Sequence, residues 1–384
     1  PLVALVRAGT DEQKQYAAFA LGNLALNNDA NRVEIARDGG ISPLVALVRA
    51  GTDEQKQYAA FALGKLADSE ENRLAIASEG GIPPLVALLR AASSEQNVQA
   101  ARALGGLASS NTPNRVAIAR EGAISSLVAL LQEGTDDQKV SAAYVLQHLA
   151  GFDEEITAEI VREGAISPLV ALVRSGTDEQ KQFAAYTLGK LADSEENRSA
   201  IASEDAISPL VTLLETGTVD QKEEAAYALG RLAKDNDANS AAIARAGGVT
   251  PLVVLVRTGT DAQKEWAVFA LRYLAANNDQ NCSAIAREGG IPPFVELLRS
   301  GTAEQRQEAA RVLGNLARDN DAYRLTILDE GAIAPLVRME RTGTDQQQED
   351  AAFALGNLAK NDAYGPAIAV ERGSSRMTLR HNRQ

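Results

Sequence analysis

The side chains that could take part in catalysis or bind a metal are few and scattered in this chain. Its two histidines, His148 and His381, lie far apart, and no cysteine–histidine cluster has the spacing of a metal site. Neither a Walker sequence nor a dinucleotide-binding glycine pattern is present. The single cysteine, Cys282, lies at a predicted exposed helix position without an evident activating group. We therefore expect neither an enzyme nor a cofactor.

Charge and composition exclude several classes of partner. The 384 residues carry a formal net charge of −13, which argues against nucleic acid or an anionic membrane surface as the partner. No apolar run approaches the roughly 18 residues of a membrane span. A lone cysteine cannot form an internal disulfide, so we expect an intracellular protein, cytoplasmic or nuclear.

The chain is built from an internal repeat. The phrase PLVALVRAGTDEQKQYAAFALG opens at Pro1 and returns unchanged at Pro43. Weaker copies begin at Pro84, Ser126, Pro168, Pro209, Pro251, Pro293 and Pro335. A period of about 42 residues is typical of a solenoid, in which each repeat buries its apolar face against its neighbours. We expect one solenoid over residues 1–370, with repeats starting near 1, 30, 71, 113, 155, 196, 238, 280 and 322, and a divergent basic tail over 371–384.

The sequence of each repeat predicts three helices of increasing length. The segment over residues 30–40 has apolar positions on one face and ends in the pair Gly39-Gly40, which indicates a short first helix. The spacing of Leu44, Val45, Leu47 and Val48 after Pro43 indicates a second helix. Residues 53–67 form a third helix. Its internal Gly64 costs about 1 kcal/mol relative to alanine, so the recurrence of this glycine suggests a close helix–helix approach.

Two polar signals recur at the helix starts. A Ser/Thr-x-x-Gln pair precedes every third helix and predicts a capping box. The pairs are Thr10/Gln13, Thr52/Gln55, Ser93/Gln96, Thr135/Gln138, Thr177/Gln180, Thr218/Gln221, Thr260/Gln263, Thr302/Gln305 and Thr344/Gln347. An asparagine also recurs in six first helices, at Asn31, Asn72, Asn114, Asn197, Asn239 and Asn281, and a capping role would account for it.

The segments NRVAIAREGAISSLVALLQEGTDDQK and AAFALGNLA strongly resemble armadillo repeats, such as those of importin-α, β-catenin and vacuolar armadillo scaffolds. The resemblance implies an all-α fold, a right-handed superhelical solenoid of about nine three-helix repeats. HEAT repeats, with two helices each, are the alternative. In the armadillo family the third helices line a concave groove in which protein partners bind. A scaffold or adaptor for an extended segment of a partner protein is therefore the expected function.

The resemblance places three positions of each third helix in this groove. We call them the first, second and third stripe positions, exemplified by Tyr16, Phe19 and Asn23. Twelve of the 16 aromatic residues lie at stripe positions, where they could anchor a partner or could instead fill the seams between third helices. The candidate groove residues are Tyr16, Phe19, Asn23, Tyr58, Phe61, Lys65, Arg102, Tyr144, His148, Phe183, Tyr186, Lys190, Tyr227, Arg231, Trp266, Phe269, Tyr273, Arg311, Asn315, Phe353 and Asn357.

The stripe differs in charge from the rest of the chain. Its basic residues are Lys65, Arg102, Lys190, Arg231 and Arg311, and its acidic residues are Glu224, Glu308 and Asp350. Basic groups between aromatic ones favour an acidic or phosphorylated partner segment, although ordinary solvated charge would give the same pattern.

Two other functions stay open. An importin-α-like transport adaptor would carry asparagine at the third stripe position in successive repeats, but here only Asn23, Asn315 and Asn357 fit. A structural spacer in a larger assembly would use the ends of the solenoid, and neither end resembles a polar capping repeat. We therefore also expect end-to-end self-association.

Overall fold

The computed structural model describes residues 1–91, 93–361, 365–366 and 368–373, and over these residues all regular secondary structure is helical. The prediction of three helices per repeat, short, medium and long, is confirmed. The all-α solenoid expected from the sequence is therefore the observed fold.

The helices follow the predicted order throughout. The first helices are α3 (Asp29–Arg37), α6 (Glu70–Ser78), α9 (Thr112–Arg120), α12 (Glu154–Arg162), α15 (Glu195–Ser203), α18 (Asp237–Arg245), α21 (Asp279–Arg287) and α24 (Asp321–Asp329). The second helices are α1 (Leu2–Ala8), α4 (Ile41–Ala50), α7 (Ile82–Ala91), α10 (Ala123–Glu133), α13 (Ile166–Ser175), α16 (Ile207–Thr216), α19 (Val249–Thr258), α22 (Ile291–Ser300) and α25 (Ile333–Thr342). The third helices are α2 (Asp11–Ala25), α5 (Asp53–Leu66), α8 (Ser94–Ala108), α11 (Asp136–Leu149), α14 (Asp178–Leu191), α17 (Val219–Ala233), α20 (Asp261–Ala275), α23 (Ala303–Ala317) and α26 (Asp345–Leu358).

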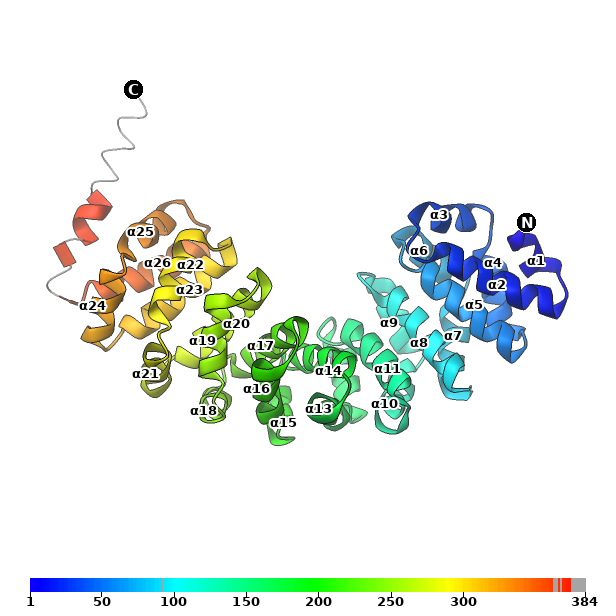
Figure 1. Cartoon of the computed structure of the whole chain (residues 1–384), viewed down its shortest axis with the longest axis horizontal. Coiled ribbons are helices and arrows are strands. Elements are labelled where there is room, and N and C mark those ends of the chain that lie inside the picture. The colour runs from blue at the N-terminus through cyan, green and yellow to red at the C-terminus, as the bar shows by residue number, and fades with distance from the viewer. Residues whose placement is uncertain (92, 362–364, 367, 374–384) are drawn as a thin grey trace, which may run out of the picture. The chain divides into compact units, whose positions relative to one another are not determined.

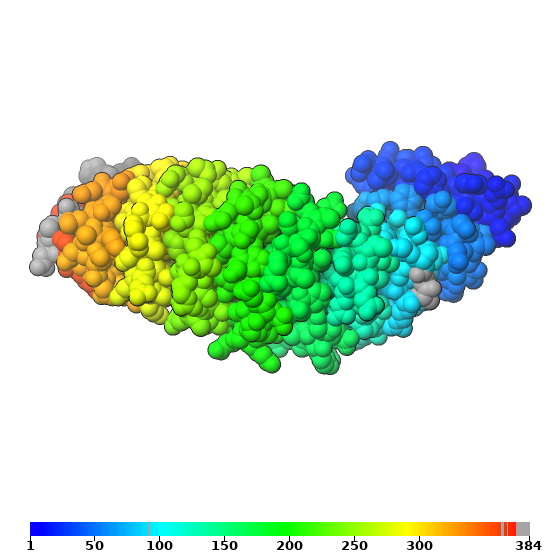
Figure 2. Space-filling view, turned by 60° about the horizontal axis from the view of Figure 1, so that its bottom comes forward, coloured from blue at the N-terminus to red at the C-terminus, as the bar shows by residue number. Residues whose placement is uncertain are grey.

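The chain divides into two compact units, Pro1–Leu191 and Ala192–Gln384. In the N-terminal unit the third helices α2, α5, α8, α11 and α14 pack against one another in chain order (Figure 1). In the C-terminal unit α17, α20, α23 and α26 do the same, and its repeats succeed one another from green to orange in Figure 2. Leucine, isoleucine, valine and alanine side chains of the second and third helices form the buried core of each unit.

The local signals of the sequence set the helix ends. All nine predicted capping pairs are present, as in Thr52 and Gln55, where each backbone N–H donates to the other residue's side-chain oxygen at 3.0 and 3.3 Å. The glycine after the first helix has a positive φ, 73° at Gly39, which a residue without Cβ adopts at no steric cost.

The capping glutamine also links neighbouring repeats. The Gln55 side-chain amide donates to the Asp11 carbonyl of the preceding third helix at 3.0 Å. The same bond recurs at Gln96, Gln180, Gln263, Gln305 and Gln347. Since these bonds join the start of one third helix to the start of the previous one, they help to set the register of adjacent repeats.

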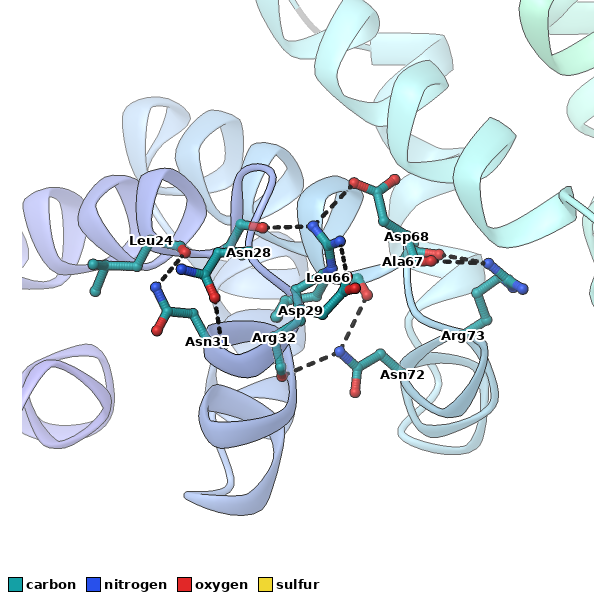
Figure 3. Close-up of polar contacts among 11 residues, drawn as sticks. Leu24, Asn28, Asp29, Asn31, Arg32, Leu66, Ala67, Asp68, Asn72 and Arg73 are labelled. Carbon is teal, nitrogen blue, oxygen red and sulfur yellow. Dashed lines mark hydrogen bonds and ion pairs between the residues drawn. The ribbon is translucent and has the colours of Figure 1, made fainter.

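The recurring asparagine of the first helices does not cap them, contrary to the prediction. The caps are other residues, such as Asn28 of α3, whereas Asn72 lies one turn inside α6. Its amide donates to the Leu66 carbonyl at the end of α5, 3.1 Å away, and to the Arg32 carbonyl of the preceding repeat, 3.3 Å away (Figure 3). It therefore satisfies a helix-end carbonyl that has no partner within its own helix.

Candidate functional site

The stripe positions recur at i, i+3 and i+7 of each third helix, so they share one face of that helix. Of the candidate residues, Tyr16, Phe19, Asn23 and Arg102 are exposed. The half-buried ones are Tyr58, Phe61, Lys65, Tyr144, His148, Phe183, Tyr186, Lys190, Arg231, Trp266, Phe269, Tyr273, Arg311 and Phe353. We call the surface of α2, α5, α8, α11 and α14 that carries the stripe the third-helix face of the N-terminal unit.

Aromatic side chains at stripe positions pack across the seams between repeats. The second-position ring of one repeat meets the first-position ring of the next, with centroids 5.0 Å apart for Phe19 and Tyr58. The Tyr144–Phe183 pair repeats this contact at 5.6 Å and the Tyr227–Trp266 pair at 4.7 Å. Seam filling, which the sequence left open, is thus one role of these rings, and their half-buried edges remain at the surface.

Three candidates are buried, which corrects their placement in the groove. Tyr227 is 7% exposed because it packs in a seam against Trp266. Asn315 and Asn357 are also buried, since their amides donate to the carbonyls of Arg272 and Gly314 in the preceding repeats at 3.4 and 2.9 Å. Burial removes these three side chains from the surface that a partner could contact.

Third-position side chains lie beside the ring one turn earlier on the same helix. Lys65 Nζ is 5.7 Å from the Phe61 centroid, and Lys190 Nζ is 5.8 Å from that of Tyr186. The i, i+4 spacing produces this contact, which favours a cation over a ring face.

His148 packs edge-on against Tyr144, with ring centroids 5.1 Å apart. Burial lowers the pKa of His148 to about 4, and the positive charges of Arg115 and Lys190 act in the same direction. The imidazole is therefore neutral near pH 7. Arg115 lies in a first helix outside the predicted groove, and the sequence analysis did not single it out.

Stripe cations of the two units differ in whether they form ion pairs. In the C-terminal unit, Arg311 pairs with the fully buried Asp350 at 3.1 Å, and Arg231 pairs with Asp193. In the N-terminal unit, Lys65 and Arg102 form no ion pair with any described residue. The stripe of this unit has no acidic residue, so any carboxylate near Lys65 or Arg102 comes from outside the stripe positions.

Arg272 is a site residue that sequence analysis missed. It replaces the recurring glycine of the third helix and pairs with Glu308 at 2.8 Å, while its guanidinium lies 5.1 Å from the Tyr273 ring. The break in the glycine pattern at this repeat was the signal that could have revealed it.

A cavity of about 280 Å³ opens on the third-helix face of the N-terminal unit. Its lining comes from four successive third helices, α5, α8, α11 and α14, and includes Phe61, Gly64, Arg102, Tyr144 and Phe183. The cavity combines aromatic walls with basic groups, which suits an apolar side chain next to an anionic group.

Cys282 is buried, contrary to the prediction of an exposed position. Its thiol donates to the Ala275 carbonyl at 3.3 Å, and burial raises its pKa to about 11. Over the described residues, no group of three or more His, Cys, Asp or Glu side chains is placed to hold a metal ion.

No single helix of the described chain is long and apolar enough to cross a membrane. Two helices, Asp237–Arg245 and Val249–Thr258, reach that length and apolarity only when they are taken together, and they meet at an angle of 84°.

The predicted self-association surfaces remain untested. Leu5 and Leu24 of the first two helices are 37% and 46% exposed, which leaves apolar groups at the surface there. Of the predicted basic tail, Arg372 pairs with Glu340 through its Nε at 2.9 Å, whereas residues 374–384 lie outside the described part of the chain. End-to-end association stays a prediction.

Protein-family models match parts of the chain. The armadillo/β-catenin-like repeat matches residues 69–109 and 278–318, each spanning one set of three helices, and a HEAT-like repeat matches residues 178–232. No curated protein matches the chain.

Solved structures match it over greater length. An engineered protein from the Northeast Structural Genomics Consortium is 32% identical, with a TM-score of 0.85, over 97% of this chain and 91% of that one. A second engineered protein from the consortium is 31% identical, with a TM-score of 0.57, over 62% of this chain and 96% of that one. A designed armadillo repeat protein is 25% identical, with a TM-score of 0.57, over 61% of this chain and 99% of that one.

Armadillo repeats are a generic protein-binding scaffold and typically carry no enzymatic activity. The repeat sequence, the three-helix architecture and these similarities agree with one another, and the chain belongs to the armadillo-repeat family.

Proposed function

We propose that the third-helix face of the N-terminal unit binds an extended, acidic or phosphorylated segment of a partner protein. The observation that carries the proposal is that two stripe cations, Lys65 and Arg102, form no ion pair with a described residue, lie beside half-exposed rings and have no acidic residue in the stripe. An anionic segment would supply the missing counter-charges, and the rings would supply apolar contacts.

The spacing of the third helices suits an extended chain. Packed helices lie about 8–10 Å apart, and an extended chain rises about 3.3 Å per residue. Roughly three residues of a partner would therefore pass each repeat, so that every third side chain could meet an equivalent stripe position.

The test is selection of displayed random peptides on the wild-type chain and on a Lys65→Glu/Arg102→Glu variant. We expect acidic peptides to be enriched on the wild type and to lose at least about tenfold in affinity on the variant, since both charge contacts become repulsive. The matched control, Arg120→Glu/Arg162→Glu, reverses two exposed cations of first helices in the same unit and should retain binding.

Synthetic peptides then separate the two anionic chemistries, because glutamate and phosphoserine versions of one enriched sequence can be titrated side by side. Rising salt should weaken both. Enrichment of neutral or basic peptides, or equal binding by the charge-reversed variant, would contradict the proposal.

An importin-α-like role has less support. It would need asparagine amides free to hold a peptide backbone, whereas the amides of Asn315 and Asn357 already donate to carbonyls of neighbouring repeats.

A further inference from the structure

A glycine near the end of a third helix makes room for a ring of the next repeat. A β-carbon added at Gly22 would lie 2.5 Å from the Phe61 ring, and one at Gly105 would lie 2.4 Å from the Tyr144 ring. The same holds in the C-terminal unit for Gly230 beneath Phe269 and Gly314 beneath Phe353. These glycines are buried because a ring at the second stripe position covers each of them.

Gly64 has the same place in its repeat but no covering ring among the described residues. The next repeat supplies Arg102 at the second stripe position, and the Arg102 side chain is exposed. The atoms nearest to a β-carbon at Gly64 would be those of Ala103, at 3.4–3.6 Å, which is ordinary contact distance. Gly64 is accordingly half-exposed and lines the 280 Å³ cavity, which we call the Gly64 cavity.

We propose that the Gly64 cavity binds one aromatic side chain of the partner segment, with a carboxylate close to that ring. The inference rests on the proposed function, because it names the side chain by which the segment is anchored. The rings of Phe61 and Tyr144 line the cavity, so an incoming ring would restore the contacts that are found in the repeats on either side.

The charges around the cavity favour the carboxylate. Arg102 makes no hydrogen bond or ion pair with a described residue, and Lys65, whose Nζ lies over the Phe61 ring, forms no ion pair with one either. Of the two acidic lining residues, Asp68 already lies 3.6 Å from Arg32, and Glu179 is an exposed residue in the first turn of α14. A carboxylate beside the bound ring would thus meet two cations that have no other anionic partner.

The size of the cavity limits its occupant. At about 280 Å³ it falls just below the range of whole small-molecule sites, so it suits one side chain and its adjacent backbone. N-acetyl-phenylalanine carries this chemistry in one small molecule, because it combines a ring with a carboxylate. N-acetyl-phenylalaninamide keeps the ring alone, and N-acetyl-alanine keeps the carboxylate alone.

The experiment measures binding of these three probes to the full chain by saturation-transfer NMR at millimolar concentration. We expect saturation transfer to the ring of N-acetyl-phenylalanine and no binding of N-acetyl-alanine. The affinity for the amide should be about threefold lower, since contacts between exposed charges contribute little each. Absence of N-acetyl-phenylalanine binding, or equal binding of N-acetyl-alanine, would overturn the proposal.

Variants assign the signal to the cavity. Arg102→Phe supplies the missing ring and should abolish binding. Arg102→Gln leaves the cavity open and should only reduce the preference for the acid over the amide, because Lys65 remains. Arg120→Phe makes the same change at an exposed position outside the cavity and should bind like the wild type. Gly64→Leu fills the cavity from the other side and replaces Arg102→Phe if that variant does not fold.

Undiminished binding by both filled variants would overturn the proposal. This outcome can be distinguished from failure of the proposed function. Acidic peptides could be enriched on the wild type and lost on charge reversal, while filling the cavity has no effect. That result would support the proposed function and contradict only the aromatic anchor. Binding of the probe without enrichment of acidic peptides would contradict the proposed function and leave only the aromatic binding by the cavity.

Discussion

The Tyr144 ring lies directly on Gly105 of the preceding repeat, so close that a β-carbon at Gly105 would come within 2.4 Å of two ring carbons. This contact accounts for the glycine here, as it does at Gly22, Gly230 and Gly314, since glycine costs helix stability but admits the ring. Gly64, which has no such ring, provides a comparison within the same unit.

Replacing Gly105 with alanine should therefore destabilise the protein, whereas Gly64→Ala should not. Forcing a methyl group against the Tyr144 ring is expected to cost about 1–3 kcal/mol. At Gly64 the methyl group meets Ala103 at ordinary contact distance, and the gain in helix propensity of up to about 1 kcal/mol should remain. Urea unfolding followed by circular dichroism measures both. Equal effects of the two substitutions would show that the ring does not account for the glycine.

Much of the fold was predictable because its determinants are local. Thr52 and Gln55 lie three residues apart and form the capping box that their spacing indicates, and Gly39 takes the positive φ expected of a helix-ending glycine. Such signals depend on a few neighbouring residues and recur in each repeat. The predicted helix order follows from them without knowledge of how the repeats pack.

The candidate site was less predictable because exposure depends on the next repeat. Phe19 and Tyr227 have the same stripe position, yet Phe19 is 42% exposed and Tyr227 is 7% exposed. The partner of Tyr227 in the following helix is Trp266, a larger ring than Tyr58, which meets Phe19. Helical periodicity places a residue on a face but does not reveal how far a seam closes over it.

Replacing a recurring asparagine of the first helices should cost more stability where its side chain is more buried. Asn114 is 2% exposed, and its amide donates to the Leu107 carbonyl at 2.9 Å and to the Arg73 carbonyl at 3.4 Å. Asn114→Ala leaves the Leu107 carbonyl buried without this donor and should cost about 1–3 kcal/mol. The matched change, Asn31→Ala, removes one bond at a more exposed site and should cost less than about 1 kcal/mol, because water can replace the amide.

Urea titrations of the two alanine variants, with Asn114→Asp and Asn31→Asp as near-isosteric companions, compare these costs. A loss at Asn31 as large as that at Asn114 would mean that the inter-repeat bond adds nothing to the bond within the repeat.

Glu224 should make stability fall as pH rises. Burial raises the pKa of Glu224 from 4.5 to about 8, and the negative charges of Glu223 and Asp220 add to the effect. Between these two values the unfolded chain releases the proton while the folded chain retains it, so the folded state loses relative stability with increasing pH. Below pH 4.5 both states are protonated, and the group has no such effect.

Glu224→Gln removes this titration and should therefore raise the melting temperature more at pH 9 than at pH 4. Glu215→Gln, a change at an exposed position of α16, is the control for the loss of one negative charge. A Glu224→Gln gain that is independent of pH, or matched by Glu215→Gln, would contradict the assignment.

Cys282 should report on unfolding, because only the thiolate reacts rapidly and the native thiol is held as a neutral donor. It is 6% exposed, its pKa is raised to about 11 by burial, and it donates to the Ala275 carbonyl. At pH 8 we expect Ellman's reagent to label the native chain slowly and the urea-unfolded chain fully, with N-acetyl-cysteine as the reactive reference.

Replacing Cys282 tests the donated hydrogen bond. Cys282→Ser should keep the bond, since Ser240 makes the equivalent one to the Ala233 carbonyl at 3.2 Å, whereas Cys282→Ala should lower the free energy of unfolding by about 1 kcal/mol. Native labelling as fast as that of the unfolded chain would show that this segment opens without global unfolding, and equal stability of the serine and alanine variants would show that the donated hydrogen bond contributes nothing.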